Sequence, residues 1–400
     1  MWPRIKAAVF ALTFVFILAA GCQRESKEFQ EASNVHKGTE EKPAADIAES
    51  FRDIYERAKA EDRLDHLDTK RAIVECLGRS GHVAVDMENQ INMTRADKMQ
   101  KFIEAAKFKE KADITVLCVE DEGSFTQYRL ETEKGEIWVE RKWIAWEKGK
   151  PQVKYEEEYR AAPWSYSDKG YLFFKKYQPE GYHGPMPYTY FRVQALDDRY
   201  REMNRKYILP IGYGENNLFF LDWNKNDYGK VDFDDLFRKL YRQVYGEDIP
   251  YTMSSETWGI GKRYRISGEE YEKVLRSFFE ISSEELRQRG TYFSQDDTYE
   301  FRPRACYDME MPEEAAYPEI IECRENGDGT KTLTVNAIYP AESSAEVLTH
   351  EVTVCDKENG GFEYISNKVL YENKELINSW HRDRLTRERW EEMFPEVEEG

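Results

Sequence analysis

The stretch QYRLETEKGEIWVERKWIAWE, residues 127–147, carries the strongest structural signal in the chain. Polar and apolar residues alternate along it, as is typical of a half-buried β-strand. Lys134-Gly135 interrupts the alternation as a two-residue turn. Folding the stretch about this turn places Arg129 opposite Glu140, so opposite charges meet across the pair. We therefore expect a β-hairpin here.

Similar strand patterns flank this hairpin, and apolar residues at helical spacing precede it. The strands that we expect next to the hairpin cover residues 113–120, 152–160 and 170–177. The expected helices are one over 44–61, one after Asp68 and one starting near Thr94. The sequence thus predicts an α+β fold in which N-terminal helices pack on an antiparallel β meander.

A second, smaller α+β module is expected at the C-terminus. Glycine-rich turns predict two β-hairpins, over 320–339 and 350–368. Helices are predicted over 233–245, after the capping box at 267–270, and again after Ser282. Residues 246–261 are typical of a linker. We expect an N-terminal domain over 44–262 and a C-terminal module with a charged tail over 263–400.

The first 21 residues have the pattern of a secretory signal peptide. Arg4 and Lys6 precede an apolar run over 7–20, which is too short to span the roughly 30 Å hydrocarbon layer comfortably as a helix. The run ends at Gly21-Cys22 and resembles the lipobox of bacterial lipoproteins. That resemblance implies acylation at Cys22, typically with palmitate, and a location on the extracytoplasmic face of the cell membrane. Residues 22–43 are polar and aperiodic, as in a flexible tether.

Composition excludes some classes of partner. The chain of 400 residues has a formal net charge of −19. Such an acidic protein repels nucleic acid, so we expect no nucleic-acid partner. It also repels anionic lipid head groups, so the lipid at Cys22, and not the protein surface, must attach the protein to the membrane.

The remaining cysteines are not arranged as closely spaced pairs, so no zinc site is expected. Cys323 and Cys355 both fall on predicted strands of the C-terminal sheet. Two interpretations stay open for them, a disulfide and a pair of buried free thiols.

Residues 224–235 partly match a calcium-binding EF-hand loop. Gly229 stands at the sixth position, Asp232 at the ninth and Asp235 at the twelfth. However, Asn224 replaces the first carboxylate, and Tyr228 removes a ligand at the fifth position. The pattern favours a structural strand–turn–helix connection and leaves calcium binding open. We predict no bound metal and no cofactor.

Aromatic residues are frequent between residues 138 and 191, mostly at alternating positions of predicted strands. This spacing favours a role in the core, with Tyr182, Tyr188 and Tyr190 in a loop as the expected exceptions. Exposed rings there are suited to stacking on sugars. The motifs HExxH, GxSxG and the phosphate-binding P-loop are absent, so we predict no catalytic residues.

Three segments of the second half resemble a family of Gram-positive bacterial lipoproteins of unknown function. They are RKYILPIGY at 205–213 with NNLF at 216–219 and DW at 222–223, FRPR at 301–304, and the hairpin from YPE at 317–319 to TVNA at 334–337. The resemblance implies the signal-and-lipobox start. It implies no activity, ligand or catalytic residue.

The sequence therefore predicts a lipid-anchored extracytoplasmic protein of the cell envelope. A non-catalytic binding or interaction protein, with a protein or a small molecule as partner, is the leading hypothesis. A solute or glycan receptor with an aromatic-lined cavity is the alternative, and an envelope-polymer hydrolase is a weaker one. A pair of carboxylates in a deep cleft with separated pKa values would favour the hydrolase.

Overall fold

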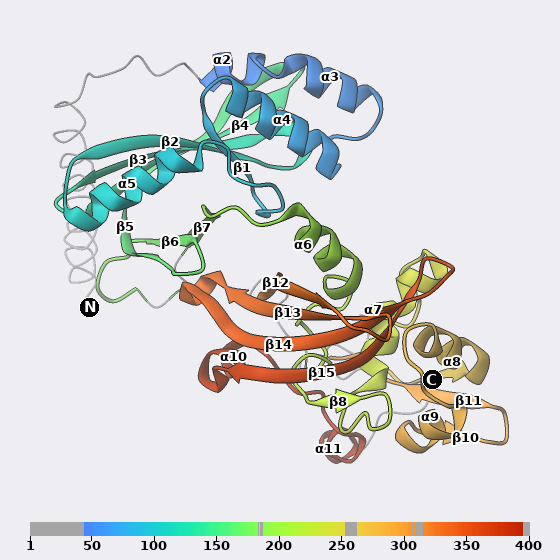
Figure 1. The fold of residues 1–400 in the computed structure, drawn as a ribbon. Coiled ribbons are helices and arrows are strands. Elements are labelled where there is room, and N and C mark those ends of the chain that lie inside the picture. Colours follow the sequence, from blue (N-terminus) through green and yellow to red (C-terminus); the bar gives the residue numbers. More distant parts are fainter. Residues whose placement is uncertain are drawn as a thin grey trace, which may run out of the picture. The chain divides into compact units, whose positions relative to one another are not determined.

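The computed structural model describes residues 44–182, 184, 187–252, 262–305, 307–308 and 315–394. The chain divides into two compact units, unit 1 over Met1–Ala195 and unit 2 over Leu196–Gly400. Figure 1 labels the elements of each unit. The signal-peptide segment, Cys22 and the tether lie outside the described residues. None of the helices in the described ranges is both long and apolar enough to cross a membrane.

Unit 1 is built around a seven-stranded sheet in which each strand pairs with the next one along the chain. Only the β1–β2 pair is parallel, and the later strands form the expected antiparallel meander. The helices are α2 (Ala44–Glu49), α3 (Arg52–Ala60), α4 (Leu67–Arg79) and α5 (Ala96–Phe108). The strands are β1 (Val83–Asp86), β2 (Ala112–Val119), β3 (Phe125–Glu133), β4 (Glu136–Glu147), β5 (Lys150–Tyr166), β6 (Tyr171–Lys176) and β7 (Tyr188–Arg192).

The central hairpin has the predicted register. Arg129 pairs with Glu140, and Leu130 pairs with Val139. The turn at Lys134-Gly135 has φ angles of 58° and 85°. Positive φ at both positions matches the right-handed twist of the flanking strands, and Gly135 adopts it without the clash that a Cβ atom would cause.

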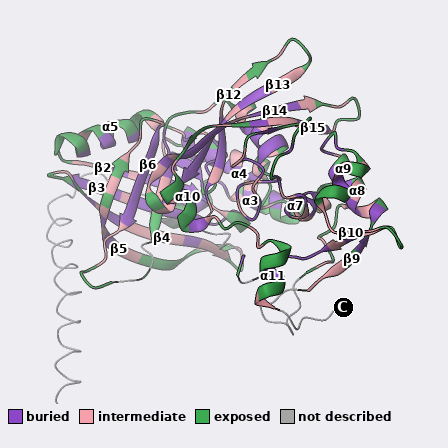
Figure 2. Cartoon of the chain, turned by 90° about the horizontal axis from the view of Figure 1, so that it is seen from below, coloured by how far each residue is buried: buried purple, intermediate pink, exposed green. Residues whose placement is uncertain are grey.

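Alternation along the strands sends apolar residues to both faces of this sheet. One core joins Leu117 and Ile144 to Ile73 and Leu77 of α4. The other core packs Leu130 and Val139 against α5 and against β6 and β7. Helices α4 and α5 therefore cover opposite faces, and in Figure 2 the buried residues gather on the strands. The α+β prediction is confirmed.

The single helix predicted over 44–61 is in fact two helices. The chain breaks between α2 and α3, where the Ser50 hydroxyl donates a hydrogen bond to the Ile47 carbonyl at 2.6 Å. Phe51 stands at the break with φ −120° and packs edge-on against Phe125 and Trp146. Apolar spacing alone did not indicate this break, because both helices present the same apolar face.

Unit 2 combines a five-stranded sheet, a three-stranded sheet and short helices. Its helices are α6 (Asp198–Met203) with a π-helical turn at Asn204–Ile208, α7 (Phe233–Tyr245), α8 (Gly268–Arg276), α9 (Ser283–Arg289), α10 (Lys374–Trp380) and α11 (Arg387–Met393). Its strands are β8 (Trp223–Asn224), β9 (Tyr264–Ser267), β10 (Tyr292–Phe293), β11 (Thr298–Phe301), β12 (Tyr317–Glu325), β13 (Thr330–Tyr339), β14 (Ser344–Asp356) and β15 (Phe362–Glu372).

Both predicted C-terminal hairpins are present, as β12–β13 and β14–β15, and they join into one sheet through the β13–β14 pair. Strand β8 adds to the edge of β15, where Trp223 pairs with Asn367. The apolar residues before β8, such as Leu218 and Phe219, are fully buried in turns of the chain.

The division between residues 195 and 196 lies earlier in the chain than the boundary that we expected between 262 and 263. Leu218, Phe219 and Leu236 share one hydrophobic core with Val335 and Val354 of the C-terminal sheet. Residues 196–252 are therefore part of unit 2, because their apolar face is buried against that sheet.

The serine caps of both predicted capping boxes are present, as Ser267 on α8 and Ser282 on α9, and the second supports a stability test. The Ser282 hydroxyl accepts a hydrogen bond from the Glu285 amide at 3.1 Å and caps α9. Ser282→Ala should lower the free energy of unfolding by about 1 kcal/mol, because a helix amide loses its partner. Urea denaturation measures this change. Gln288→Ala, an exposed position on the same helix, is the control. Equal stability of the two variants would contradict the capping role.

Candidate functional site

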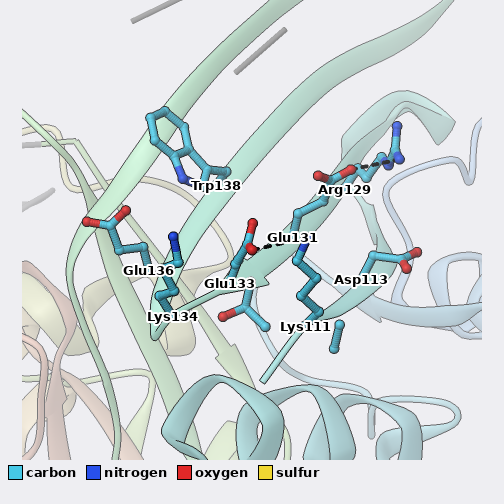
Figure 3. Close-up of a pocket in the computed structure, with 10 residues that line it drawn as sticks. Lys111, Asp113, Arg129, Glu131, Glu133, Lys134, Glu136 and Trp138 are labelled. Atoms are coloured by element: carbon cyan, nitrogen blue, oxygen red, sulfur yellow. Dashed lines mark ion pairs between the residues drawn. The ribbon is translucent and has the colours of Figure 1, made fainter. Parts of the chain in front are cut away.

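Unit 1 contains a pocket of about 220 Å³ on one face of strands β2, β3 and β4 (Figure 3). The pocket is rich in charged side chains and includes one tryptophan. Its lining residues are Lys111, Ala112, Asp113, Arg129, Glu131, Thr132, Glu133, Lys134, Glu136 and Trp138.

Strand register explains why these side chains meet. Asp113 of β2 lies opposite Glu131 of β3, which lies opposite Trp138 of β4. Residues opposite each other on neighbouring strands point to the same face of a sheet. Their sequence neighbours Leu130 and Val139 point to the other face and are fully buried there. The alternation that builds the core thus also builds the pocket.

Ion pairs order part of the pocket wall. Arg129 lies 2.7 Å from Glu131 and 3.8 Å from Glu140. Lys111 lies 3.1 Å from Glu133. Pairs of this kind at a surface contribute little to stability, but they hold the long side chains along the wall of the pocket.

The aromatic loop named from the sequence is separate from this pocket. Tyr182 is 46% exposed. Tyr188, which is 38% exposed, and the half-buried Tyr190 lie on strand β7, paired with β6, and not in the expected loop. None of them lines the pocket. Most rings of the predicted belt are buried, for example Phe174 and Phe191, as expected for residues of a sheet core.

The candidate calcium loop at residues 224–235 forms a tight turn followed by α7. The Asn224 side chain accepts a hydrogen bond from the Asn226 amide, and the Asp227 carboxylate accepts one from the Gly229 amide. Asp232 caps α7 by accepting from the Asp235 amide at 3.0 Å. In the described ranges, no group of three or more His, Cys, Asp or Glu side chains is arranged to hold a metal ion.

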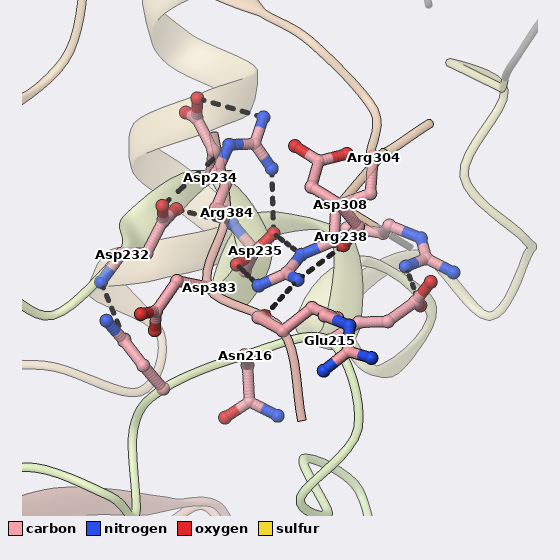
Figure 4. A network of polar contacts seen from close by, with 12 residues as sticks. Glu215, Asn216, Asp232, Asp234, Asp235, Arg238, Arg304, Asp308, Asp383 and Arg384 are labelled. Carbon is pink, nitrogen blue, oxygen red and sulfur yellow. Dashed lines mark hydrogen bonds and ion pairs between the residues drawn. The ribbon is translucent and has the colours of Figure 1, made fainter. Parts of the chain in front are cut away.

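Asp235, the last residue of that loop, is the centre of a buried network of charges in unit 2 (Figure 4). Arg304 donates from Nε and Nη2 to its two carboxylate oxygens, at 3.0 and 2.7 Å. Arg384 donates to the same carboxylate at 2.7 Å. Asp235 and Arg304 are 1% and 2% exposed. This is a two-pronged ion pair taken out of water, reinforced by a third charge.

A second pair extends the network toward the C-terminus. Arg302 donates to Asp308 at 2.7 Å and to the Leu385 carbonyl at 3.0 Å, and the Leu385 amide donates to Asp308 at 3.0 Å. Arg304 also donates to the Arg382 carbonyl at 2.6 Å. The arginines of the FRPR segment thus fasten the chain at 382–385 to α7.

The pKa values in this network separate in opposite directions. Burial raises the pKa of Asp232, and repulsion from Asp235 adds to the effect. Burial also disfavours the charged form of Asp235, but Arg384 and Arg304 outweigh it and lower the pKa of this carboxyl. Such a separation of pKa values can indicate a catalytic acid and base. Here, however, the carboxylates accept hydrogen bonds from arginines and main-chain amides, as in a structural network.

His350 forms a second buried polar group in unit 2. Its Nδ1 lies 2.7 Å from the Asn367 side-chain oxygen, and its Nε2 lies 3.0 Å from the Tyr213 hydroxyl. The Asn367 amide nitrogen donates to the Phe219 and Leu221 carbonyls, so its oxygen faces the ring. Nδ1 therefore carries the proton and Nε2 accepts. Burial lowers the pKa of His350 from 6.5 to about 4, and the hydrogen bond to Asn367 opposes this only in part.

Cys323 and Cys355 are both free thiols and not a disulfide. Cys323 lies on β12 opposite Leu333, and Cys355 lies on β14 opposite Thr330, so strand β13 separates them. Two strands that are not neighbours in a sheet lie about 10 Å apart, beyond the reach of a disulfide. The disulfide interpretation was wrong because it considered only that both cysteines fall on strands.

The pocket in unit 1 was not predicted from the sequence. The signal was present in the alternating charges of residues 129–136, but it served only to set the hairpin register. Charged residues on a strand usually form a solvated face, and nothing local shows that three strands together leave a hollow.

Comparison with known proteins gives one match. A model of a family of unknown function (DUF6070) matches residues 37–384. The matched range includes the segments 205–213, 301–304 and 317–337 and ends at Arg384, the residue that binds Asp235. No curated protein and no solved structure shows significant similarity to the chain. Because the match covers most of its length, the protein belongs to the family of unknown function DUF6070.

Proposed function

We propose that the protein is a non-catalytic binding or interaction protein of the bacterial cell envelope. A lipid on Cys22 would anchor it to the extracytoplasmic face of the membrane, with residues 23–43 as a tether. Two observations support this part of the proposal. They are the signal-peptide and lipobox pattern, and the resemblance to Gram-positive lipoproteins. The partner is a small molecule or a protein, and the net charge of −19 argues against nucleic acid.

The observation that carries the binding role is the pocket on β2, β3 and β4. It combines charged groups of both signs with an aromatic ring, held by a rigid sheet. Polar groups that converge on a hollow beside an aromatic surface are the usual make-up of a ligand site. At about 220 Å³ the pocket suits a small molecule, or one unit of a larger partner.

A glycan receptor is the second candidate, and Trp138 in the pocket wall favours it. Sugars bind proteins by stacking on aromatic faces and by hydrogen bonding to carboxylates, and both are available here. The exposed Tyr182 and Tyr188 offer a further stacking surface on the same unit.

Thermal unfolding of the full chain, purified in a mild non-ionic detergent, tests the binding role. The ligands to compare are short peptides, oligosaccharides, cell-wall fragments and calcium. A ligand that binds only the folded protein, at 100 times its dissociation constant, adds about 2.7 kcal/mol to the free energy of unfolding. If Lys134→Gln reduces the ligand-induced shift in unfolding temperature, the result supports the pocket as the binding site. A shift with oligosaccharides alone supports the glycan receptor, and the absence of any shift contradicts a small-molecule site.

Lysine 148 provides a matched control for this variant. Lys134 and Lys148 are both exposed, both precede a glycine in a hairpin turn, and have φ angles of 58° and 49°. Only Lys134 lines the pocket. Lys148→Gln should therefore preserve the ligand-induced shift.

The anchor is tested separately at Cys22. Cys22→Ala should abolish incorporation of labelled palmitate and release the protein from membranes, or leave an unprocessed precursor, because the thiol that accepts the lipid is gone. Labelling of cells followed by membrane fractionation measures both effects. Cys76→Ala, at a half-buried thiol of α4, is the control. Unchanged labelling of the Cys22 variant would contradict the lipoprotein assignment.

A further inference from the structure

The charges that line the pocket are not all matched. Arg129, Glu131, Lys111, Glu133 and Glu136 take part in ion pairs, the last with Arg160 at 3.3 Å. In the described ranges, no ion pair joins either Asp113 or Lys134 to another side chain. One carboxylate and one ammonium of opposite charge are thus available to a ligand.

These two groups lie at opposite ends of the pocket. Figure 3 shows Asp113 below Arg129 on the right and Lys134 next to Glu136 on the left. Asp113 is level with Glu131 in the sheet, and Lys134 follows Glu131 by three residues, in the turn directly after β3. At about 3.3 Å per residue, the two backbone positions are at most about 10 Å apart along the direction of β3.

We propose that the pocket binds short peptides with free termini, with the ligand ammonium at Asp113 and its carboxylate at Lys134. An extended chain spans about 3.3–3.6 Å per residue, so a tripeptide matches the separation of the two backbone positions along the sheet. The volume of about 220 Å³ restricts the ligand to small side chains. This inference rests on the proposed binding function and names its ligand class.

Overall charge supports a zwitterion over an anion. The lining contains three cationic and four anionic side chains, a net charge of −1. A phosphate or a polycarboxylate would face more negative than positive charge, whereas a zwitterion gains at both ends. The Trp138 ring adds an apolar surface for a small side chain of the ligand.

Isothermal titration calorimetry of the full chain in detergent, with trialanine as the probe, tests the proposal. We expect binding that weakens about tenfold when the amino terminus is acetylated or when the carboxyl terminus is amidated, because a charged hydrogen-bonding partner is lost. Asp113→Asn should weaken the binding of free trialanine by a similar factor and leave the binding of the acetylated peptide unchanged. Lys134→Gln should also weaken the binding of free trialanine and leave the binding of the amidated peptide unchanged.

This pattern separates recognition of the termini from a general loss of fold. Asp168→Asn and Lys148→Gln, at exposed turn positions of unit 1 outside the pocket, should bind trialanine like the wild type. Equal affinity for free and doubly blocked trialanine would overturn the zwitterion inference and leave the pocket as a binding site. If trialanine does not bind at all while an oligosaccharide does, the ligand class is wrong. If neither binds, both this inference and the small-molecule form of the proposed function fail.

Discussion

Replacing Asp235 with Asn should lower the free energy of unfolding by about 3–5 kcal/mol, the largest effect expected at a single polar residue here. Asp235 and Arg304 are almost completely buried, and Arg384 binds the same carboxylate. Asparagine keeps the size and some hydrogen bonds but leaves the buried Arg304 guanidinium without its carboxylate. It also removes the shortest ion pair of Arg384, which keeps only longer pairs with Asp232 and Asp234, at 3.8 and 3.5 Å. Urea denaturation of the full chain followed by circular dichroism measures the loss.

A second substitution isolates the electrostatic cause of this loss. In the double variant Asp235→Asn with Arg304→Met, one uncompensated charge is removed, so stability should recover in part relative to Asp235→Asn alone. Glu358→Gln, at an exposed turn, should leave stability unchanged. If Asp235→Asn behaves like Glu358→Gln, the buried network does not hold unit 2 together.

His350 should make the stability of the protein depend on pH between about 6.5 and 4. Its pKa is about 4 in the folded state, whereas an unfolded histidine has a value near 6.5. Between these values the unfolded chain binds a proton that the folded protein does not, so stability falls as the pH falls. A shift of this size corresponds to about 3 kcal/mol, fully present above pH 6.5 and lost as pH decreases to 4.

Other groups titrate in the same range, so the difference between variants must be measured. The raised pKa of Asp232 acts in the opposite direction, because a carboxyl that keeps its proton when folded stabilises the protein at lower pH. This contribution is common to the wild type and to His350→Gln and cancels in their difference. The stability gap between the two proteins should narrow by about 3 kcal/mol from pH 7 to pH 4.

The control for this measurement is His66→Gln, at an exposed position before α4. Its stability curve should run parallel to that of the wild type. Parallel curves for His350→Gln as well would contradict a neutral, buried His350. A gap that widens toward acid would mean that the folded state binds the proton.

The sequence predicted those parts of the fold in which neighbouring segments pair. The hairpin at residues 127–147 has the expected register because the Lys-Gly turn and the alternation both specify it. The hairpins of unit 2 and the serine caps of α8 and α9 are also present where the sequence predicts them. In each case the information lies within about 20 consecutive residues.

Contacts between residues that are far apart in the sequence were not predicted. Trp223 pairs with Asn367 across more than 140 residues of sequence, and Asp235 meets Arg304 and Arg384. The sequence pattern does not distinguish a buried arginine from an exposed one. The carboxylates of residues 232–235 were therefore considered as calcium ligands, although their partners are guanidinium groups.

The candidate site was missed for a related reason. Each strand shows an ordinary alternation of charged and apolar residues, and a hollow arises only when β2, β3 and β4 are placed side by side. The sequence drew attention to Tyr182 and Tyr188 instead, because aromatic residues in a Pro-Gly loop are conspicuous. Those rings are exposed as expected, but they lie outside the pocket.

Hydrogen–deuterium exchange of the full chain, with and without trialanine, tests the central claim that this pocket is the binding site. Ligand contacts slow local opening, so we predict protection at residues 111–113 and 129–138. The Lys134→Gln variant should lose this protection, whereas Lys148→Gln should keep it. Exchange that is unchanged at these residues, or protection confined to the neighbourhood of Tyr182 and Tyr188, would contradict the claim.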